Sequence, residues 1–412
     1  MEKLARQLTL KYAFLQSTYW ITQCAICSFA AVFLHYKHFD NTQIGIIFSV
    51  SSFFTIILQP LISSFADKSK RITLRQIVII FMFIVMAAAI VLYIIPNSFL
   101  LTAIIYILIN TIQFTLNPLL NSLAFEHMNK GIPMNYGLAR GTGSIAFAVM
   151  SYLIGIFVNQ YGAGILIAVF IISYCFFIIS AFTFRLKNPL SSSVSIADHM
   201  VSGEHTTADT KEHPEAAPAG ILEFFLKYKR FSLLLIGVTL LFYTHNMLNT
   251  YLINIVENAG GNSADFGLSL TIAAVLELPT MAAFFFIVKK IDCSTLIKVS
   301  AFFFLVKIII AWLAPNIAAV YLSQAFQMLA FALFTPASVF YVNSIIEEQD
   351  RIKGQSMLGV AIFGISGTLS NITGGKILDT VGVSDMLLLG TIVSAVGLIV
   401  ICFSTEKIKI KA

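Results

Sequence analysis

The stretch that decides the fold is LSLTIAAVLELPTMAAFFFIV, residues 268–288, an apolar run with one charged residue, Glu277. About 20 apolar residues in a helix are enough to cross the hydrocarbon core of a bilayer. A second run, SAFFFLVKIIIAWLA at residues 300–314, holds Lys307 in the same way. A charge at the bilayer centre costs at least ~2.5–3.5 kcal/mol on insertion scales, and such residues mark functional sites. We therefore expect Glu277 and Lys307 to act inside a membrane.

The composition places the whole chain in a lipid bilayer. Of its 412 residues, 58% are hydrophobic and 11% are charged, and the mean hydropathy is +0.87. A soluble domain is about 25% charged. The apolar run after Lys11 is longer than the core of a signal peptide and no small-residue cleavage site follows it, so we expect it to stay as a span. The net charge of +6 follows from loop charges and does not indicate a nucleic-acid partner.

A window of bilayer length predicts an all-α membrane protein with 12 transmembrane helices in two six-helix halves. The predicted spans lie at residues 11–36, 42–66, 75–95, 99–125, 135–157, 162–184, 231–254, 264–288, 295–314, 317–343, 355–378 and 384–404. Of the 26 lysines and arginines, 22 fall on the side of the two termini, and only Lys37 and Lys376 fall on the other side. The positive-inside rule then predicts that both termini are cytoplasmic, in the plasma membrane or a bacterial inner membrane.

One long polar connection divides the chain into three parts. We expect an N-terminal half at residues 1–185, a cytoplasmic linker at 186–229 and a C-terminal half at 230–412. The linker is poor in large apolar residues, which is typical of a solvated tether. Its three histidines could suggest metal binding, but their spacing is irregular. Two halves in parallel repeat, with a binding site between them at the midplane, is the expected architecture of a secondary transporter.

The motifs of enzymes and pumps are missing from the sequence. There is no phosphate-binding G-x-x-x-x-G-K-[ST] loop, no H-E-x-x-H zinc motif and no G-x-S-x-G nucleophile elbow. The five cysteines favour packing over redox or metal chemistry. We expect no enzyme activity, no catalytic residues, no bound metal and no cofactor, with an ion gradient as the energy source.

The end of the second span carries a motif of a known family. Gln59-Pro60-Leu61 precede Ser63-Ser64-Phe65-Ala66-Asp67-Lys68, and the chain resembles here, and over nearly its whole length, the major facilitator superfamily. Within it the resemblance is to the branch that contains the lactose permease and the nucleoside–proton symporters. Ser63 replaces the motif's usual Gly, and Ser69-Lys70-Arg71 replaces its Gly-Arg. The resemblance implies a conformational latch at Asp67, Lys68 and Arg71; an ordinary charged turn is the alternative.

The fifth span resembles the family's substrate-binding segment. Arg140, Ser144 and Phe147 are spaced i, i+4, i+7 and share one helix face. A guanidinium, a hydroxyl and a ring suit a polyhydroxylated or heterocyclic ligand. Trp20 in the first span offers a ring that stacks on a sugar or base, or fills space. Arg140 has an alternative role as the partner of Glu126 near the end of the fourth span.

The charged residues of the eighth and ninth spans also match the family. Family members keep a Glu at the position of Glu277 and usually an Arg at the position of Lys307. Lys307 is a departure with a consequence, because a buried ammonium releases its proton more readily than a guanidinium. We expect Glu277 and Lys307 to couple protons, with a purely structural ion pair between them as the alternative.

The lactose permease's other proton-handling residues are not retained. At the positions of its Lys, His and Glu in the tenth span, an ungapped alignment places Gln324, Gln327 and Ala330. Its charged pair between the seventh and eleventh spans becomes His245 and Phe363, and its sugar-binding Glu becomes Ser122. These departures argue against lactose as the substrate and against the permease's proton pathway.

The seventh span supplies the remaining polar residues of the expected site. His245 can bind substrate, relay a proton or simply pack. Asn246 and Asn249 in this span, and Gln324 and Gln327 in the tenth, either bind substrate or join helices.

The sequence as a whole predicts a monomeric proton symporter for a small polar solute, an oligosaccharide or a nucleoside. Drug or metabolite antiport and facilitated diffusion are the alternatives.

Overall fold

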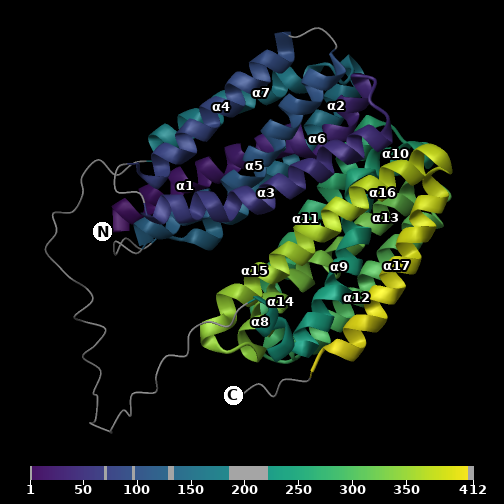
Figure 1. Ribbon diagram of the computed structural model, residues 1–412. Coiled ribbons are helices and arrows are strands. Elements are labelled where there is room, and N and C mark those ends of the chain that lie inside the picture. The colour runs from purple at the N-terminus through teal and green to yellow at the C-terminus, as the bar shows by residue number, and fades with distance from the viewer. Residues whose placement is uncertain (1, 69–71, 95–97, 129–133, 185–220, 407–412) are drawn as a thin grey trace, which may run out of the picture.

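The computed structural model describes residues 2–68, 72–94, 98–128, 134–184 and 221–406, and these residues form helices with no strand among them. Eleven helices are long and apolar enough to cross a membrane, or 12 if the bent pair at the N-terminus is one span. The predicted fold class, an all-α protein of about 12 spans, is confirmed. In Figure 1 the helices form two bundles, one coloured purple to blue and one teal to yellow.

The first bundle contains the helices up to residue 183. They are α1 (Glu2–Gln23), the π-helical turn η1 (Cys24–Ser28), α2 (Ala30–Tyr36), α3 (Asn41–Lys68), α4 (Leu74–Ile94), α5 (Phe99–Met128), α6 (Tyr136–Tyr161) and α7 (Ile165–Thr183). The first span bends by 45° after η1. Wide turns of this kind bend a helix because one residue is inserted into its hydrogen-bond ladder.

The second bundle contains the helices from residue 221 onward. They are α8 (Ile221–Lys227), α9 (Lys229–Thr250), α10 (Leu252–Asn258), α11 (Ser263–Val288), α12 (Cys293–Trp312), α13 (Ile317–Ala325), η3 (Phe326–Met328), α14 (Phe331–Ile345), η4 (Glu348–Asp350), α15 (Arg351–Gly359), η5 (Val360–Ile365), α16 (Ser366–Thr380) and α17 (Val383–Ser404). Three of the predicted spans in this bundle are interrupted. The seventh breaks at Tyr251, between α9 and α10, η3 divides the tenth, and η5, a π-helical segment, divides the eleventh.

Side-chain caps explain why several helices begin where they do. Asn135 accepts the N–H of Leu138 at the start of α6, and Asp292 caps α12 in the same way. Asn262 and Asp265 form a reciprocal capping box at the start of α11. Such caps satisfy N–H groups that have no partner inside the helix.

The two bundles meet along two helix pairs at one end of the molecule, which we call the closed end. In the first seam a Cβ added to Gly155 of α6 would lie 2.9 Å from the Cα of Gly267 in α11. In the second seam Gly45 of α3 lies against the backbone carbonyl of Asn371 in α16. Glycine at these positions allows the helix backbones to touch. Figure 1 shows the bundles diverging from this end toward the end that carries the N and C labels.

Hydrogen bonds between the halves follow the same seams. Ser49 donates to the carbonyl of Thr368 at 2.8 Å, and Ser151 and Thr271 share a 2.9 Å hydrogen bond. Among the described residues, every side-chain hydrogen bond that joins the two halves involves α3 or α6 of the first half. Beyond them each seam opens into an apolar groove, of about 430 Å³ beside α6 and α11 and about 320 Å³ beside α3 and α16. The structure is therefore closed at one end.

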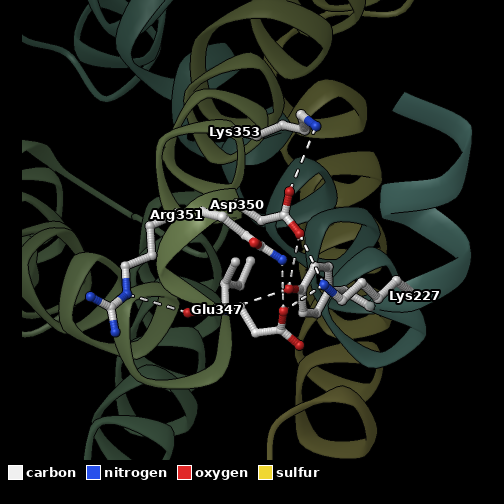
Figure 2. Close-up of polar contacts among 8 residues, drawn as sticks. Lys227, Glu347, Asp350, Arg351 and Lys353 are labelled. Atoms are coloured by element: carbon white, nitrogen blue, oxygen red, sulfur yellow. Dashed lines mark hydrogen bonds and ion pairs between the residues drawn. The ribbon is translucent and has the colours of Figure 1, made fainter. Parts of the chain in front are cut away.

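A charged cluster fixes the short helix α8 to the segment before α15 (Figure 2). Lys227 donates to Glu347 at 2.7 Å and to the fully buried carboxylate of Asp350 at 3.2 Å, and Lys353 lies 3.7 Å from Asp350 on the other side. The hydrogen bond to Glu347 raises the pKa of the Lys227 ammonium. The contacts that raise the lysine pKa stabilise the folded protein at every pH below the ordinary lysine pKa. This stabilisation is lost only as the pH rises through the raised pKa.

Candidate functional site

The tenth span, Ile317–Ile345, is broken near its middle, and the break carries Gln327. Helix α13 ends at Ala325, the 3-10 turn η3 holds Gln327, and α14 begins at Phe331. The carbonyl of Ala330 accepts the N–H of Phe334 at 3.1 Å and also the Ser300 hydroxyl of α12 at 2.6 Å. Non-helical backbone at membrane depth is tolerated only inside the protein or beside a cavity, and broken spans of this kind form transporter binding sites.

Gln327 bridges the two membrane-embedded charges of the second half. Its side-chain oxygen accepts a hydrogen bond from Lys307 Nζ at 2.5 Å, and its side-chain nitrogen donates to Glu277 Oε1 at 2.9 Å. Lys307 is 2% exposed and Gln327 is 5% exposed, whereas Glu277 is partly exposed. A buried ammonium is tolerated only when it is hydrogen-bonded, which the amide achieves here. The carboxylate is therefore the member of the chain that a solute or water can reach.

This bridge changes the expected relation between Glu277 and Lys307. Within the described residues no direct ion pair joins them, and the neutral amide of Gln327 stands between the two charges. The sequence argument treated Gln327 as a substrate ligand. In the structure its oxygen and one of its N–H groups already serve Lys307 and Glu277.

His245 of α9 lies in an aromatic pocket beside the hydrogen-bonded residues Glu277, Gln327 and Lys307. Its ring stacks on Phe331 with centroids 5.2 Å apart, and Phe242 and Phe304 contact it edge-on. The Nε2 atom shares a 2.9 Å hydrogen bond with the Asn249 amide, while Nδ1 has no partner. The structure thus brings His245 and Asn249 together, as expected for residues four apart on a helix.

Two other predicted amides lie elsewhere. Asn246 donates to the carbonyl of Ile362 at 3.0 Å and to the Ser366 hydroxyl at 2.9 Å, so it joins α9 to the eleventh span. Gln324 is 2% exposed and its side-chain nitrogen has no partner.

In the first half, the predicted residues gather around Trp20 of α1. The Arg140 guanidinium lies over the indole ring, 4.5 Å from its centroid, and Phe147 meets the ring edge-on at 6.0 Å. Gly143 makes room for the indole, because a Cβ there would lie 2.5 Å from Trp20 Cδ1. The indole N–H has no partner, and no hydrogen bond is recorded for the partly exposed Ser144 within the described residues.

Arg140 is not paired with Glu126. Among the described residues the guanidinium makes no ion pair, and its recorded contact is with the Trp20 ring. Arg140 lies on α6 and Glu277 on α11, the two helices that meet in the first seam between the halves. The two groups therefore belong to one pair of contacting helices, one helix from each half.

A polar network beside Arg140 was not anticipated from the sequence. Gln16 of α1 donates to the Tyr12 hydroxyl at 2.5 Å and to Asn121 of α5 at 3.2 Å, and its oxygen is buried without a partner. The signal was present, because Tyr12, Gln16 and Tyr19 recur at helical spacing inside an apolar span. The rule that polar residues inside a membrane mark a pathway applies to this face as it does to Glu277.

Some predictions concern residues outside the part of the chain that the structure describes, and one concerns metal binding. The side chains of the expected latch, Asp67, Lys68 and Arg71, lie outside the described residues, as do residues 186–220 of the expected linker; residues 221–227 of it form α8. Within the described residues no group of three or more His, Cys, Asp or Glu side chains is placed to hold a metal ion.

Fold and site together define a membrane transporter of the major facilitator type. A model of the MFS_1 like family matches residues 12–389, and the chain belongs to that family.

Similar proteins cover most of the chain. The maltose permease of Geobacillus stearothermophilus is 23% identical over 379 residues, 89% of this chain and 87% of the permease. The uncharacterized transporter YwbF of Bacillus subtilis (strain 168) is 24% identical over 364 residues, 88% of this chain and 84% of that protein. Among solved structures, the nucleoside transporter NupG superposes with a TM-score of 0.75 at 14% identity, covering 96% of this chain and 98% of NupG. The peptide transporter POT in complex with sulfate superposes with a TM-score of 0.68 at 11% identity, covering 97% of this chain and 93% of POT.

Proposed function

We propose that the protein is a proton-coupled symporter that takes up a small polar organic solute, an oligosaccharide or a nucleoside, by alternating access. The observation that carries the proposal is the hydrogen-bonded chain Glu277–Gln327–Lys307 at the break of the tenth span. A carboxylate held at membrane depth, with one oxygen engaged and the rest of the group partly exposed, is suited to gain and lose a proton during transport.

Gln327 supplies a physical reason for coupling. While Glu277 is ionised, it accepts the hydrogen bond from the Gln327 amide and is linked through that amide to the Lys307 charge. Protonation removes the charge and leaves a hydroxyl that can donate to a solute. Loading is thereby favoured by the protonated form, and deprotonation on the cytoplasmic side favours release. A solute drives this cycle only through different affinities for the two conformations.

The first half supplies groups suited to a polyhydroxylated ring. The Trp20 ring offers a stacking surface with an unpartnered N–H, and Arg140 offers a fork of donors that no carboxylate occupies in the described residues. Phe147 and Ser144 complete this wall, with His245 and Asn249 on the opposite half. The name of the maltose permease and that of the nucleoside transporter NupG both fit solutes that contain a sugar ring.

The orientation follows from the distribution of Lys and Arg. We place both termini in the cytoplasm of a cell whose plasma membrane holds the protein as a monomer. The closed end then faces outward, and the structure corresponds to the inward-facing state.

The test begins with purified protein and a thermal-shift screen against sugars, nucleosides and aromatic acids, since a bound ligand stabilises the folded state. A solute that binds is then assayed for uptake into proteoliposomes with and without an inward proton gradient. Wild-type protein should accumulate the solute only with the gradient. Glu277→Gln should abolish accumulation, whereas Glu257→Gln, which alters an exposed carboxylate on α10, should leave it unchanged.

Two results would decide against the proposal. Gradient-independent equilibration by the wild type would indicate facilitated diffusion. Solute-driven proton uptake by Glu277→Gln equal to that of the wild type would remove Glu277 from the coupling role.

A further inference from the structure

Asp379, near the end of α16, forms a polar contact between the halves that the site described above does not include. Its Oδ1 accepts hydrogen bonds from the backbone N–H of Asn41 at 3.2 Å and from the Asn41 side-chain amide at 2.8 Å. Its Oδ2 accepts from the backbone N–H and from the hydroxyl of Thr42, both at 2.6 Å. Asn41 and Thr42 are the first two residues of α3, in the other half. We call this contact the Asp379 cap.

The contact is a helix cap supplied by the opposite half of the protein. The first N–H groups of a helix have no partner inside the helix and carry its positive end, so a carboxylate there is stabilising. The usual cap comes from the residue just before the helix. Here the Asp40 carboxylate caps the N–H of Gln43, and Asp379 accepts the N–H groups of Asn41 and Thr42 in addition. The cap therefore exists only while the halves are together at the closed end.

The backbone around the cap is built for this approach. Gly375 lies one turn before Asp379 on the same face of α16, and a Cβ on it would overlap the carbonyl oxygen of Asn41. The hydroxyl of Tyr251, which lies between α9 and α10, donates to the carbonyl of Asn371 at 2.6 Å and also contacts that of Asn41. Three segments thus converge where the carboxylate meets α3.

The exposure of the cap makes it reversible. Asp379 and the first residues of α3 remain in contact with solvent. When the halves separate, water can replace all four hydrogen bonds, so opening avoids the large penalty of leaving a buried charge unpaired. A contact that must break and re-form in every transport cycle needs this property.

We propose that Asp379 is a positioning residue of the transport cycle, which holds the closed end shut by capping α3 across the two halves. The inference rests on the alternating-access function proposed above. It concerns the opening of the closed end and not the binding of a solute, so it can be tested without knowing the substrate.

The experiment measures opening of the closed end in purified protein in lipid nanodiscs. A reporter cysteine replaces Ser151, which is fully buried in the other seam, and its reaction rate with a maleimide is measured above the background of the native cysteines. Asp379→Asn removes the negative charge and turns an N–H donor of the new amide toward the donors of α3. The maleimide reaction rate of Ser151→Cys should then rise about tenfold or more, as expected for loss of charge-assisted hydrogen bonds. Thr42→Val, which removes one donor from the opposite side, should raise it by a smaller factor.

Two controls separate a gate from a general loss of structure. Asp385→Asn alters an exposed carboxylate in the first turn of α17 and should leave the rate unchanged. A second reporter replaces Ser180, which is fully buried inside the first bundle, and its rate should stay constant in every variant. An unchanged Ser151→Cys rate in Asp379→Asn would overturn the proposal. So would equal increases at both reporters, because that result indicates unfolding and not opening.

Discussion

The closest backbone contact in the α6–α11 seam leads to a quantitative prediction for Gly267→Ala. A Cβ at Gly267 would lie 2.8 Å from the Cα of Gly155 and closer still to the carbonyl oxygen of Ser151. Ordinary contacts begin at 3.4 Å, so α6 and α11 must separate by at least about 0.6 Å. Both neighbours are backbone atoms, which cannot move aside as a flexible side chain can.

The expected cost follows from measured overpacking in protein interiors. Inserting a methyl group into a well-packed contact costs about 1–3 kcal/mol. The contact exists only in the conformation with the closed end shut, so the cost falls on that state alone. A bias of this size shifts a two-state equilibrium by about 5- to 150-fold. Gly267→Ala should therefore raise the fraction of molecules whose closed end is open by about 5- to 150-fold.

The assay uses a reporter in the seam that the substitution does not touch. Ser49→Cys in α3 replaces a residue that is 1% exposed and hydrogen-bonded to the opposite half. Its maleimide reaction rate in nanodiscs should rise by the predicted factor, because the rate follows the open population while that population is small. Gly141→Ala in α6 is the matched control, since nothing lies within 4 Å of its added Cβ. An unchanged rate in Gly267→Ala, or an equal rise in Gly141→Ala, would refute the reasoning.

Two further predictions concern the polar contacts of the second half. Gln327→Leu should lower the free energy of unfolding by about 3 kcal/mol or more, because it leaves the ammonium of Lys307 buried without its acceptor; thermal unfolding in detergent measures the loss. Lys227→Met should release α8 from Asp350, and deuterium exchange of residues 221–227 should become faster.

Each of these predictions has a matched variant. Gln324→Leu removes a buried amide whose nitrogen already lacks a partner, so it should be neutral or stabilising. A loss equal to that of Gln327→Leu would contradict the role given to the bridge. Lys229→Met alters an exposed lysine at the first position of α9, two residues after α8 ends at Lys227. If it accelerates exchange as much as Lys227→Met does, the ion pairs are not what holds the helix.

The spans were predictable from the sequence because bilayer length and backbone hydrogen bonding leave few alternatives to a helix. The observed α11, Ser263–Val288, differs from the predicted span at 264–288 by one residue. The break in the tenth span was not predictable, because residues 317–343 read as one apolar run. The contacts at the break join different helices, as that of Ser300 with the carbonyl of Ala330 does, and only the packed structure shows them.

The same distinction applies to the site. Glu277 and Lys307 were identified because a charge in an apolar run is costly wherever it lies. Arg140 was identified because the fifth span resembles the family's substrate-binding segment. The partners of these residues depend on the approach of different helices, so the bridge through Gln327 and the stacking of Arg140 on Trp20 were beyond the sequence argument. Gln16 was not predicted because the amides that were predicted come from the seventh and tenth spans, where the lactose permease carries charged residues.

The amide bridge has a consequence for how this family can diversify. The side-chain amide of glutamine does not ionise, so Gln327 places no titratable group between Glu277 and Lys307. In the genetic code a single nucleotide change converts a glutamine codon into one for glutamate, histidine or lysine. Each of these replacements would place an ionisable group at the break of the tenth span. The set of ionisable groups at this break can therefore change by one mutation at a single position.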